Sequence, residues 1–272
     1  VPRFVHALNE TAIRRFCAEV PAPWVLKPRM ESGTIGIRKV HDEAALWAAI
    51  DTLGDRASYH LLEQFIPGDV FHVDSLVDHS RVLTAVASGY GRPPFEVSHS
   101  GGVFTTQLLP RGSADDRALL TTNRAVLAAM GLVRGVSHTE FIKAHDGTFY
   151  FLETSARVGG AHIVELIEAA TGANYWAEWA KIELAGGKTP YAPPVMRDDY
   201  AGLVTCLATD EHPDLSAFSD PEVVWRMPKA YHAGVIVASP SHARVSALVA
   251  DYAARFAAQF SAFIPPGETP RD

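Results

Sequence analysis

Two glutamates and a turn in the middle of the chain could hold a divalent metal ion. Glu140 and Glu153 lie on β-type runs on either side of His145-Asp146-Gly147. Asp-Gly supplies the positive φ that a tight hairpin needs, so the runs are predicted to pair as antiparallel strands. Pairing brings the two carboxylates opposite one another, where they repel unless a cation lies between them. Mg²⁺ is the expected occupant, since it is usually held by one or two carboxylates together with substrate phosphates.

The second run continues with residues suited to anions. Ser155 and Arg157 follow Glu153 by two and four positions, so their side chains share its strand face. A guanidinium can hold a phosphate or carboxylate through two hydrogen bonds. Gly159 and Gly160 then precede an apolar helical pattern, and a helix that begins after glycines offers free N–H groups to an anion. Alone, this pattern is more typical of a polar hairpin with solvated Glu and Arg side chains.

A lysine beside a glycine-containing loop forms a second candidate site. Lys27 ends an apolar strand, and the loop over residues 30–36 leads into another predicted strand over 37–40. A strand–loop–strand unit can cradle phosphates with backbone N–H groups, and the Lys27 ammonium would lie beside them. An ordinary hairpin is the alternative interpretation of the loop.

The elements that must position these residues follow from hydrophobic periodicity and capping signals. Helices are expected over residues 9–20, 42–53, 113–130, 161–170, 175–184 and 241–260. Further strands are expected over residues 59–66, 70–77, 82–90, 104–109, 203–208, 223–227 and 233–238. The loop over residues 91–102 is long for a compact domain, which is typical of a functional or mobile segment.

Three blocks in this order carry a family resemblance. They are Val25-Leu26-Lys27-Pro28 with Ser32-Gly33-Thr34-Ile35-Gly36, then Leu62-Glu63-Gln64-Phe65-Ile66-Pro67-Gly68, then His138-Thr139-Glu140-Phe141 with Glu153-x-Ser155-x-Arg157-x-Gly159-Gly160. Together they resemble the ATP-grasp superfamily, and more narrowly its carboxylate–amine ligases, the type of L-amino-acid ligase and D-alanine–D-alanine ligase-like enzymes. The resemblance implies an α+β ATP-grasp fold, with two lobes closing on ATP and a small C-terminal α+β subdomain.

The resemblance also implies a domain plan. We expect a small lobe with an N-terminal helix over 1–68, a large lobe with the metal site over 69–188, a C-terminal subdomain over 199–262 and a tail over 263–272. Family members carry a further N-terminal domain, with an additional phosphate-binding lysine, before this point. The chain begins Val1-Pro2 without Met, so we expect a piece of a longer enzyme, impaired on its own.

The resemblance assigns a nucleotide site to the first two blocks. It implies phosphate contacts from Lys27, Ser32, Gly33 and Thr34, and adenine contacts from Glu63 and the backbone of Phe65 and Ile66. Val70 stands where many members have a glutamate for the ribose hydroxyls, which valine cannot bind. We expect Asp69, His72 or Asp74 to substitute, although His72 is as readily a half-buried strand histidine.

The third block is assigned to metal and substrate. The resemblance implies Glu140, Glu153 and Ser155 as ligands of one or two Mg²⁺ ions, for which Mn²⁺ can substitute. Ser155 departs from the usual asparagine. Catalytic roles fall to Arg157, Glu153 and Lys27, and substrate contacts to Arg157, Gly159, Gly160 and His138. His138 either orients substrate or only fills the strand face.

Composition limits the function classes. The 272 residues are 47 % hydrophobic, enough for a sizeable core, and contain no long apolar run that would suggest a membrane span. The net charge of −7, without a basic cluster, argues against nucleic acid as a partner. Two cysteines are too few for a disulfide framework, so a reduced, cytoplasmic setting is the default expectation.

The expected function is an ATP-dependent carboxylate–amine ligase that forms an amide or peptide bond through an acyl phosphate and releases ADP and phosphate. Its partners would be ATP and small-molecule carboxylate and amine substrates. An ATP-grasp kinase or carboxylase-type enzyme and a non-catalytic ATP-binding module are the alternatives. The sequence names neither substrate and leaves the oligomeric state, including a homodimer, open.

Overall fold

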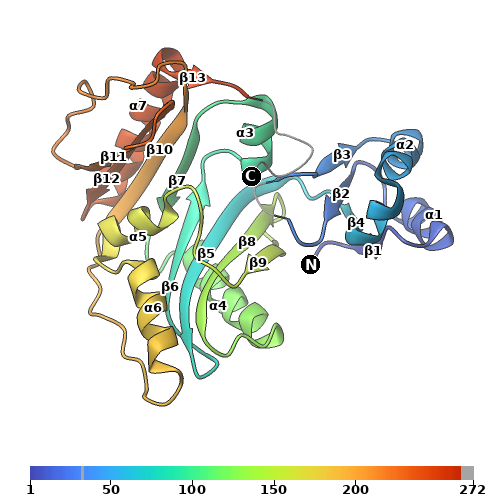
Figure 1. Ribbon diagram of the computed structural model, residues 1–272, viewed down its shortest axis with the longest axis horizontal. Coiled ribbons are helices and arrows are strands. Elements are labelled where there is room, and N and C mark those ends of the chain that lie inside the picture. The colour runs from blue at the N-terminus through green and yellow to red at the C-terminus, as the bar shows by residue number, and fades with distance from the viewer. Residues whose placement is uncertain (32–33, 265–272) are drawn as a thin grey trace.

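The computed structural model describes residues 1–31 and 34–264 and combines helices with antiparallel sheets (Figure 1). Within these ranges the strands form a four-stranded and a nine-stranded sheet. The smaller sheet has the order β1-β4-β2-β3, with strands β1 (Phe4–His6), β2 (Trp24–Pro28), β3 (Arg38–Val40) and β4 (His60–Gln64). This mixture confirms the α+β class. The expected contacts of Ser32 and Gly33 and the end of the expected tail, 265–272, lie outside the described residues.

The smaller sheet carries its own core. Helices α1 (Glu10–Glu19) and α2 (Glu43–Leu53) are followed by the short 3₁₀ helix η1 (Gly54–Tyr59). Asn9 and Asp42 cap α1 and α2, as the sequence predicts, by accepting hydrogen bonds from backbone N–H groups one turn on. The apolar faces of both helices pack on the sheet in one cluster with Ile13, Phe16, Leu26, Leu46 and Leu62. In Figure 1 this lobe lies to one side of the larger sheet.

The larger sheet has the order β11-β12-β10-β7-β6-β5-β8-β9, with β13 paired to β10. Its strands are β5 (Gly68–Asp78), β6 (Arg81–Tyr90), β7 (Phe104–Leu108), β8 (Gly135–Ala144), β9 (Phe149–Ser155), β10 (Tyr200–Ala208), β11 (Val223–Arg226), β12 (His232–Ser239) and β13 (Ser261–Ala262). Its helices are α3 (Pro94–Ser100), α4 (Ala114–Ala129), α5 (Ile163–Thr171), α6 (Tyr175–Ala185) and α7 (His242–Gln259).

Helices cover both faces of this sheet. Leu203 of β10 belongs to the cluster formed with α5 and α6, whereas the next residue, Val204, belongs to the cluster formed with α7. Because successive strand residues point to opposite faces, α5 and α7 cover opposite sides. Helix α4 packs through Leu119 on Val73 and Phe141. His72 and Asp74 alternate with Val73 on β5, so they face away from α4.

The C-terminal segment, expected as a small α+β subdomain, joins the larger sheet. Strand β10 pairs with β7 over Gly202–Thr205, so residues 199–262 extend the sheet of the larger lobe. β7 pairs with β6 along one edge, so the N–H and C=O groups of its other edge need partners. β10 supplies those hydrogen-bond partners. Gly202 permits a close approach of α7, since a Cβ there would lie 2.3 Å from Val249 Cγ2.

Two local expectations also change. The loop predicted over 91–102 contains α3, and the helix predicted over 113–130 spans only Ala114–Ala129, with Met130 62 % exposed just after it. Leu119 and Leu127 of α4 are buried. No helix in the described part of the chain is long and apolar enough to cross a membrane.

Candidate active site

A cleft of about 530 Å³ lies between the two sheets. Its walls come from β2, β3 and the connector before β5 on one side, and from β6, α3, β8 and β9 on the other. The predicted site residues that line it are Lys27, Thr34, Glu63, Phe65, Ile66, His138, Glu140, Glu153, Arg157 and Gly160. The fold therefore gathers residues from all three sequence blocks into one cavity. Asp69, His72, Asp74, Ser155 and Gly159 do not line it.

The β8–β9 hairpin brings the two glutamates together. The register pairs Glu140 directly with Glu153, which confirms the cross-strand arrangement predicted from the sequence. Gly147 closes the turn at a φ of +87°, a conformation that glycine adopts without strain. The hairpin thus presents two carboxylates side by side to the cleft.

The two carboxylates have different electrostatic surroundings. Burial alone would raise the pKa of Glu140, but the hydrogen bond and charge of His138 and the Tyr90 hydroxyl hold that pKa below its usual value. The Tyr90 hydroxyl donates to Glu140 Oε1 at 2.7 Å. Partial loss of hydration in the cleft and the charge of Glu140 raise the pKa of Glu153. The pair therefore carries negative charge that the surrounding protein stabilises unevenly.

The donor set fits a hard divalent cation. Glu153 makes no hydrogen bond or ion pair within residues 1–31 and 34–264, so its oxygens are available as ligands. Two adjacent carboxylates match the oxygen preference of Mg²⁺. The third predicted ligand, Ser155, lies opposite His138 on β9 and outside the cleft lining. Glu140 and Glu153 are thus the residues suited to hold the metal.

Lys27 lies in the cleft wall, paired with an acidic partner. Its Nζ is 2.7 Å from Glu63 Oε2 and donates to the Leu152 carbonyl at 3.4 Å. Burial raises the pKa of Glu63, and the positive charge of Lys27 opposes this shift. The family resemblance implied phosphate contacts for Lys27 and adenine contacts for Glu63, whereas β2 and β4 are neighbouring strands and hold the two side chains together.

The connector between β4 and β5 supplies an apolar wall. Phe65 and Ile66 line the cleft, and Lys39 Nζ lies 3.6 Å from the centroid of the Phe65 ring. Such a cation–π contact holds an ammonium over an aromatic face. Lys39 also lines the cleft and was not predicted as a site residue. Its position on the strand after the glycine-containing loop was the available signal.

Thr34 joins the two sides of the cleft. Its φ of 64° is left-handed, and its Oγ1 lies 2.6 Å from Ser98 Oγ on α3. The loop over 30–36 therefore contacts a helix that the sequence analysis treated as irregular.

The segment after β9 carries the anion-binding candidates. Arg157 is half-buried, lines the cleft and donates from Nη1 to the Val158 carbonyl at 2.8 Å. Gly160 also lines the cleft, whereas Gly159 is buried beneath it. Helix α5 begins at Ile163, two residues later than predicted, because the preceding residue His162 adopts a left-handed φ of 65°.

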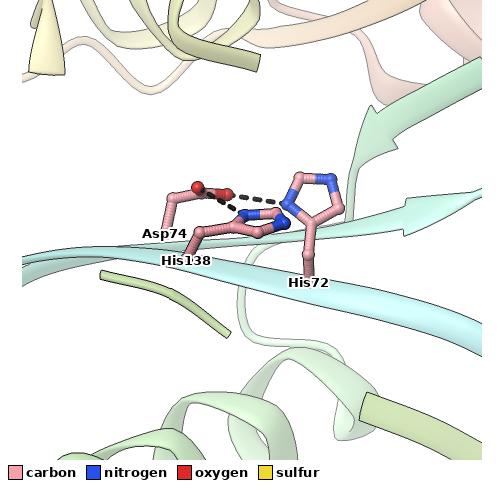
Figure 2. Close-up of side chains that lie close together, drawn as sticks. All are labelled: His72, Asp74 and His138. Atoms are coloured by element: carbon pink, nitrogen blue, oxygen red, sulfur yellow. Dashed lines mark hydrogen bonds and ion pairs between the residues drawn. The ribbon is translucent and has the colours of Figure 1, made fainter. Parts of the chain in front are cut away.

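The residues expected to replace the ribose-binding glutamate lie elsewhere. His72 and Asp74 are buried and hydrogen-bonded to each other, and Asp74 also contacts His138, as Figure 2 shows. Asp69 is exposed and does not line the cleft. Because β5 turns these side chains into buried contacts or toward solvent, none of the three lines the cleft.

Tyr90 is the clearest residue that the sequence analysis missed. It ends β6, lines the cleft and bonds to Glu140. No motif marks it, because the contact depends on β6, β5 and β8 lying side by side. His138, predicted either to orient substrate or to fill the strand face, lines the cleft and contacts Asp74 and Glu140.

Comparison with known proteins defines the class. The ATP-grasp domain family model matches residues 20–165, more than half of the chain. The chain belongs to the ATP-grasp family. Within that family it is similar to carboxylate–amine ligases, as the sequence blocks indicate.

Two curated relatives illustrate the similarity. A D-alanine–D-alanine ligase of Desulfotalea psychrophila is 30 % identical over 162 residues, which cover 56 % of this chain and 50 % of that protein. A D-alanine–D-alanine ligase of Ruthia magnifica is 27 % identical over 143 residues, which cover 52 % and 48 %. The chain therefore spans about half the length of these relatives.

Solved structures share the fold. L-amino acid ligase from Bacillus licheniformis superposes with a TM-score of 0.65 at 21 % identity, covering 92 % of this chain and 66 % of that one. A carboxyaminoimidazole ribonucleotide synthase from Aspergillus clavatus, complexed with ATP, superposes with a TM-score of 0.69 at 12 % identity, covering 94 % and 69 %. At these identities the likeness establishes the ATP-grasp fold alone.

Proposed function

We propose that the chain is the ATP-binding and metal-binding part of an ATP-dependent carboxylate–amine ligase, which forms an amide or peptide bond and releases ADP and phosphate. The observation that carries this proposal is the Glu140–Glu153 pair, which faces the same cleft as Lys27 and Arg157. The names of the D-alanine–D-alanine ligase relatives support the same reaction class.

The proposed reaction has two steps. A substrate carboxylate oxygen attacks the γ-phosphorus of ATP, the bond to the bridging oxygen breaks, and ADP leaves with that electron pair. An amine then attacks the carbon of the acyl phosphate, loses a proton and displaces phosphate. Activation is needed because a free carboxylate has no good leaving group. The protein contributes positioning and charge neutralisation, as in other phosphoryl transfers.

Each polar residue of the cleft has a role in this scheme. Glu140 and Glu153 would hold one or two Mg²⁺ ions, which supply neutralisation of phosphate charge and which Mn²⁺ can replace. Lys27 would contact phosphate, and Arg157 would steady the transferring phosphoryl group. Phe65 and Ile66 offer an apolar surface and backbone groups to adenine, while Gly160 faces the substrate anion.

A non-catalytic ATP-binding module is a second candidate, and one observation favours it. Val70 lines the cleft at the position expected to bind ribose, and the nearby polar residues Asp69, His72 and Asp74 do not line it. Without a carboxylate for the ribose hydroxyls, ATP would bind more weakly.

Phosphate release from ATP separates the candidates. With Mg²⁺ and pairs of amino acids, a ligase releases phosphate only when a carboxylate and an amine acceptor are both present, and mass spectrometry finds the amide. An enzyme that consumes ATP with a single acceptor is a kinase or carboxylase-type enzyme. A chain that binds ATP in calorimetry without turnover under any pairing is a binding module.

A further inference from the structure

A chain of buried polar contacts runs beneath the candidate metal ligands. His72 Nε2 lies 2.8 Å from Thr106 Oγ1, and His72 Nδ1 lies 2.7 Å from Asp74 Oδ2. Asp74 Oδ1 lies 2.9 Å from His138 Nδ1, and His138 Nε2 lies 3.5 Å from Glu140 Oε1. We refer to Thr106, His72, Asp74, His138 and Glu140 as the buried hydrogen-bond chain. Figure 2 shows its centre, where the two oxygens of the Asp74 carboxylate contact one imidazole each.

The chemistry of the groups fixes the direction of these bonds. An ionised carboxylate only accepts, so His72 and His138 both donate to Asp74 from Nδ1. His138 can then direct a second N–H, on Nε2, at Glu140. The cross-strand register supports the arrangement, because β5 and β8 pair His72 with Glu140 and Asp74 with His138.

Burying these ionisable groups costs folding free energy, so their presence calls for an explanation other than stability. His72 and Asp74 are 0 % and 1 % exposed, and His138 is 7 % exposed. Buried ionisable groups require complete pairing, and hydrophobic residues of similar volume would often be at least as stable. Of the three, only His138 reaches the cleft, so direct contact with ligands does not explain His72 and Asp74.

The three residues also have the spacing of a metal-ligand group, with ligand atoms within 4.8 Å of one another. Their hydrogen bonds argue against that use. Both nitrogens of His72 and both carboxylate oxygens of Asp74 already have protein partners. His138 uses Nδ1 on Asp74 and points Nε2 toward Glu140.

The same cluster supports the turn after Arg157. A Cβ on Gly159 would lie 2.9 Å from Asp74 Oδ1 and 3.0 Å from His138 Nδ1. The turn at Gly159 therefore packs directly against the side chains of Asp74 and His138. One cluster thus contacts both the metal-ligand strand and the segment assigned to anions.

We propose that Asp74 and His138 are positioning residues that fix the orientation of the Glu140 carboxylate and the seat of the Gly159 turn. Asp74 holds the His138 ring, His138 Nε2 lies beside one oxygen of Glu140, and the Tyr90 hydroxyl donates to that same oxygen and lies 3.5 Å from His138 Nε2. This positioning proposal rests on the proposed function only through the role of Glu140 as a metal ligand. Groups that orient metal ligands in this way are typically worth roughly 10–100-fold in metal affinity.

Two amide substitutions at one position separate positioning from simple packing. His138→Asn places an amide near the former Nδ1 and keeps the contact to Asp74, whereas His138→Gln places one near Nε2 and keeps the contact to Glu140. We expect Mn²⁺ affinity in the presence of ATP, measured by electron paramagnetic resonance, to fall about 10–100-fold in His138→Asn and less than about tenfold in His138→Gln. Gly159→Ala should lower Mn²⁺ affinity as much as His138→Asn does, because its methyl group would press on the side chains of Asp74 and His138.

His60→Asn is the matched control. His60 is a buried strand histidine of the smaller sheet that bonds to the Arg56 carbonyl and does not line the cleft. We expect it to lower the melting temperature and leave Mn²⁺ affinity unchanged. Equal Mn²⁺ affinity in His138→Asn, His138→Gln and wild type would overturn the inference, as would a stoichiometric transition metal that Asp74→Asn removes. Wild-type protein that binds no Mn²⁺ with ATP would overturn the proposed function and the inference with it.

Discussion

At the residue scale, the buried ion pair between Lys27 and Glu63 lies in the wall of the cleft proposed to bind ATP. Lys27 is 9 % exposed and Glu63 is 5 % exposed, and their charged atoms lie 2.7 Å apart. Removing one member of a buried pair leaves the other charge without compensation. The proposed nucleotide site and the fold of the smaller lobe would therefore depend on the same two side chains.

Lys27→Ala should reduce both stability and ATP affinity. Loss of a partner from a buried pair costs about 3–5 kcal/mol of unfolding free energy. Adding Glu63→Gln should recover part of that stability without recovering ATP affinity. Urea unfolding and calorimetry with ATP provide the two measurements. Unchanged ATP affinity in Lys27→Ala would remove this lysine from the nucleotide site.

Substitutions of Glu153 and Ser155 should have very different effects on ATP turnover. Glu153 faces Glu140 in the cleft, whereas Ser155 lies outside the cleft lining. We expect Glu153→Gln to lower ATP turnover by roughly 10²–10³-fold, the usual effect of removing an electrostatic contact at a reacting centre. Ser155→Ala should cost little, and Ser155→Asn should tighten magnesium binding. The measurement is the Mg²⁺ dependence of turnover, and equal damage from Ser155→Ala and Glu153→Gln would make serine a direct ligand.

Arg157→Lys should not behave as a conservative change. Arg157 lines the cleft, and an ammonium cannot offer the planar pair of donors that a guanidinium offers a phosphoryl group. Turnover should fall much more than ATP affinity, as compared by steady-state kinetics and calorimetry. Near-normal turnover would leave Arg157 as a structural residue.

At the element scale, local signals were sufficient for the central hairpin. Asp146-Gly147 supplied the turn, and the similar distances of Glu140 and Glu153 from it predicted that they lie opposite one another. The register shifts between Glu140 and Phe141, and this irregularity, which the turn signal alone does not specify, sets the observed pairing. The pairing of β5 with β8 joins residues 64 positions apart, such as Asp74 and His138, and no local pattern specifies it. The sequence therefore placed His72 and Asp74 on one predicted strand, but it did not identify their partners.

The same limit explains the C-terminal segment. Its strands and α7 follow from local periodicity, whereas the pairing of β10 with β7 depends on an edge formed almost 100 residues earlier. Tyr90 was missed for a similar reason, since its contact with Glu140 crosses two strand pairings. Residues whose role comes from one hairpin were predictable, and those whose role comes from the sheet order were not.

An acid-sensitive contact joins α7 to the segment before β11. The hydrogen bond from the Tyr252 hydroxyl, with help from Arg244, lowers the pKa of Asp220. Because the folded-state pKa lies below the unfolded one, this contribution to stability is present above about pH 4 and is lost as the pH falls through the folded-state pKa. Asp220→Asn should flatten the acid side of the stability curve, measured by urea unfolding from pH 7 to 3. A slope identical to wild type would contradict this assignment.

At the scale of the whole molecule, the proposed active site is formed by two sheets that share one cleft. The smaller sheet contributes Lys27, Glu63 and the connector, and the larger sheet contributes Glu140, Glu153 and Arg157. Neither set alone could hold a nucleotide phosphate and a metal ion together. The substrates of the complete reaction stay proposals, since the chain spans about half the length of its curated relatives.

The transfer of a carboxylate oxygen to phosphate tests the central claim most directly. The protein is incubated with ATP, Mg²⁺ and amino-acid pairs whose carboxylates carry ¹⁸O, and the released phosphate is analysed by mass spectrometry. An acyl phosphate intermediate predicts one carboxylate-derived ¹⁸O in each phosphate, together with one amide bond. Amide formation with unlabelled phosphate, or phosphate release that needs no carboxylate, would contradict the assignment of this cleft to a carboxylate–amine ligase.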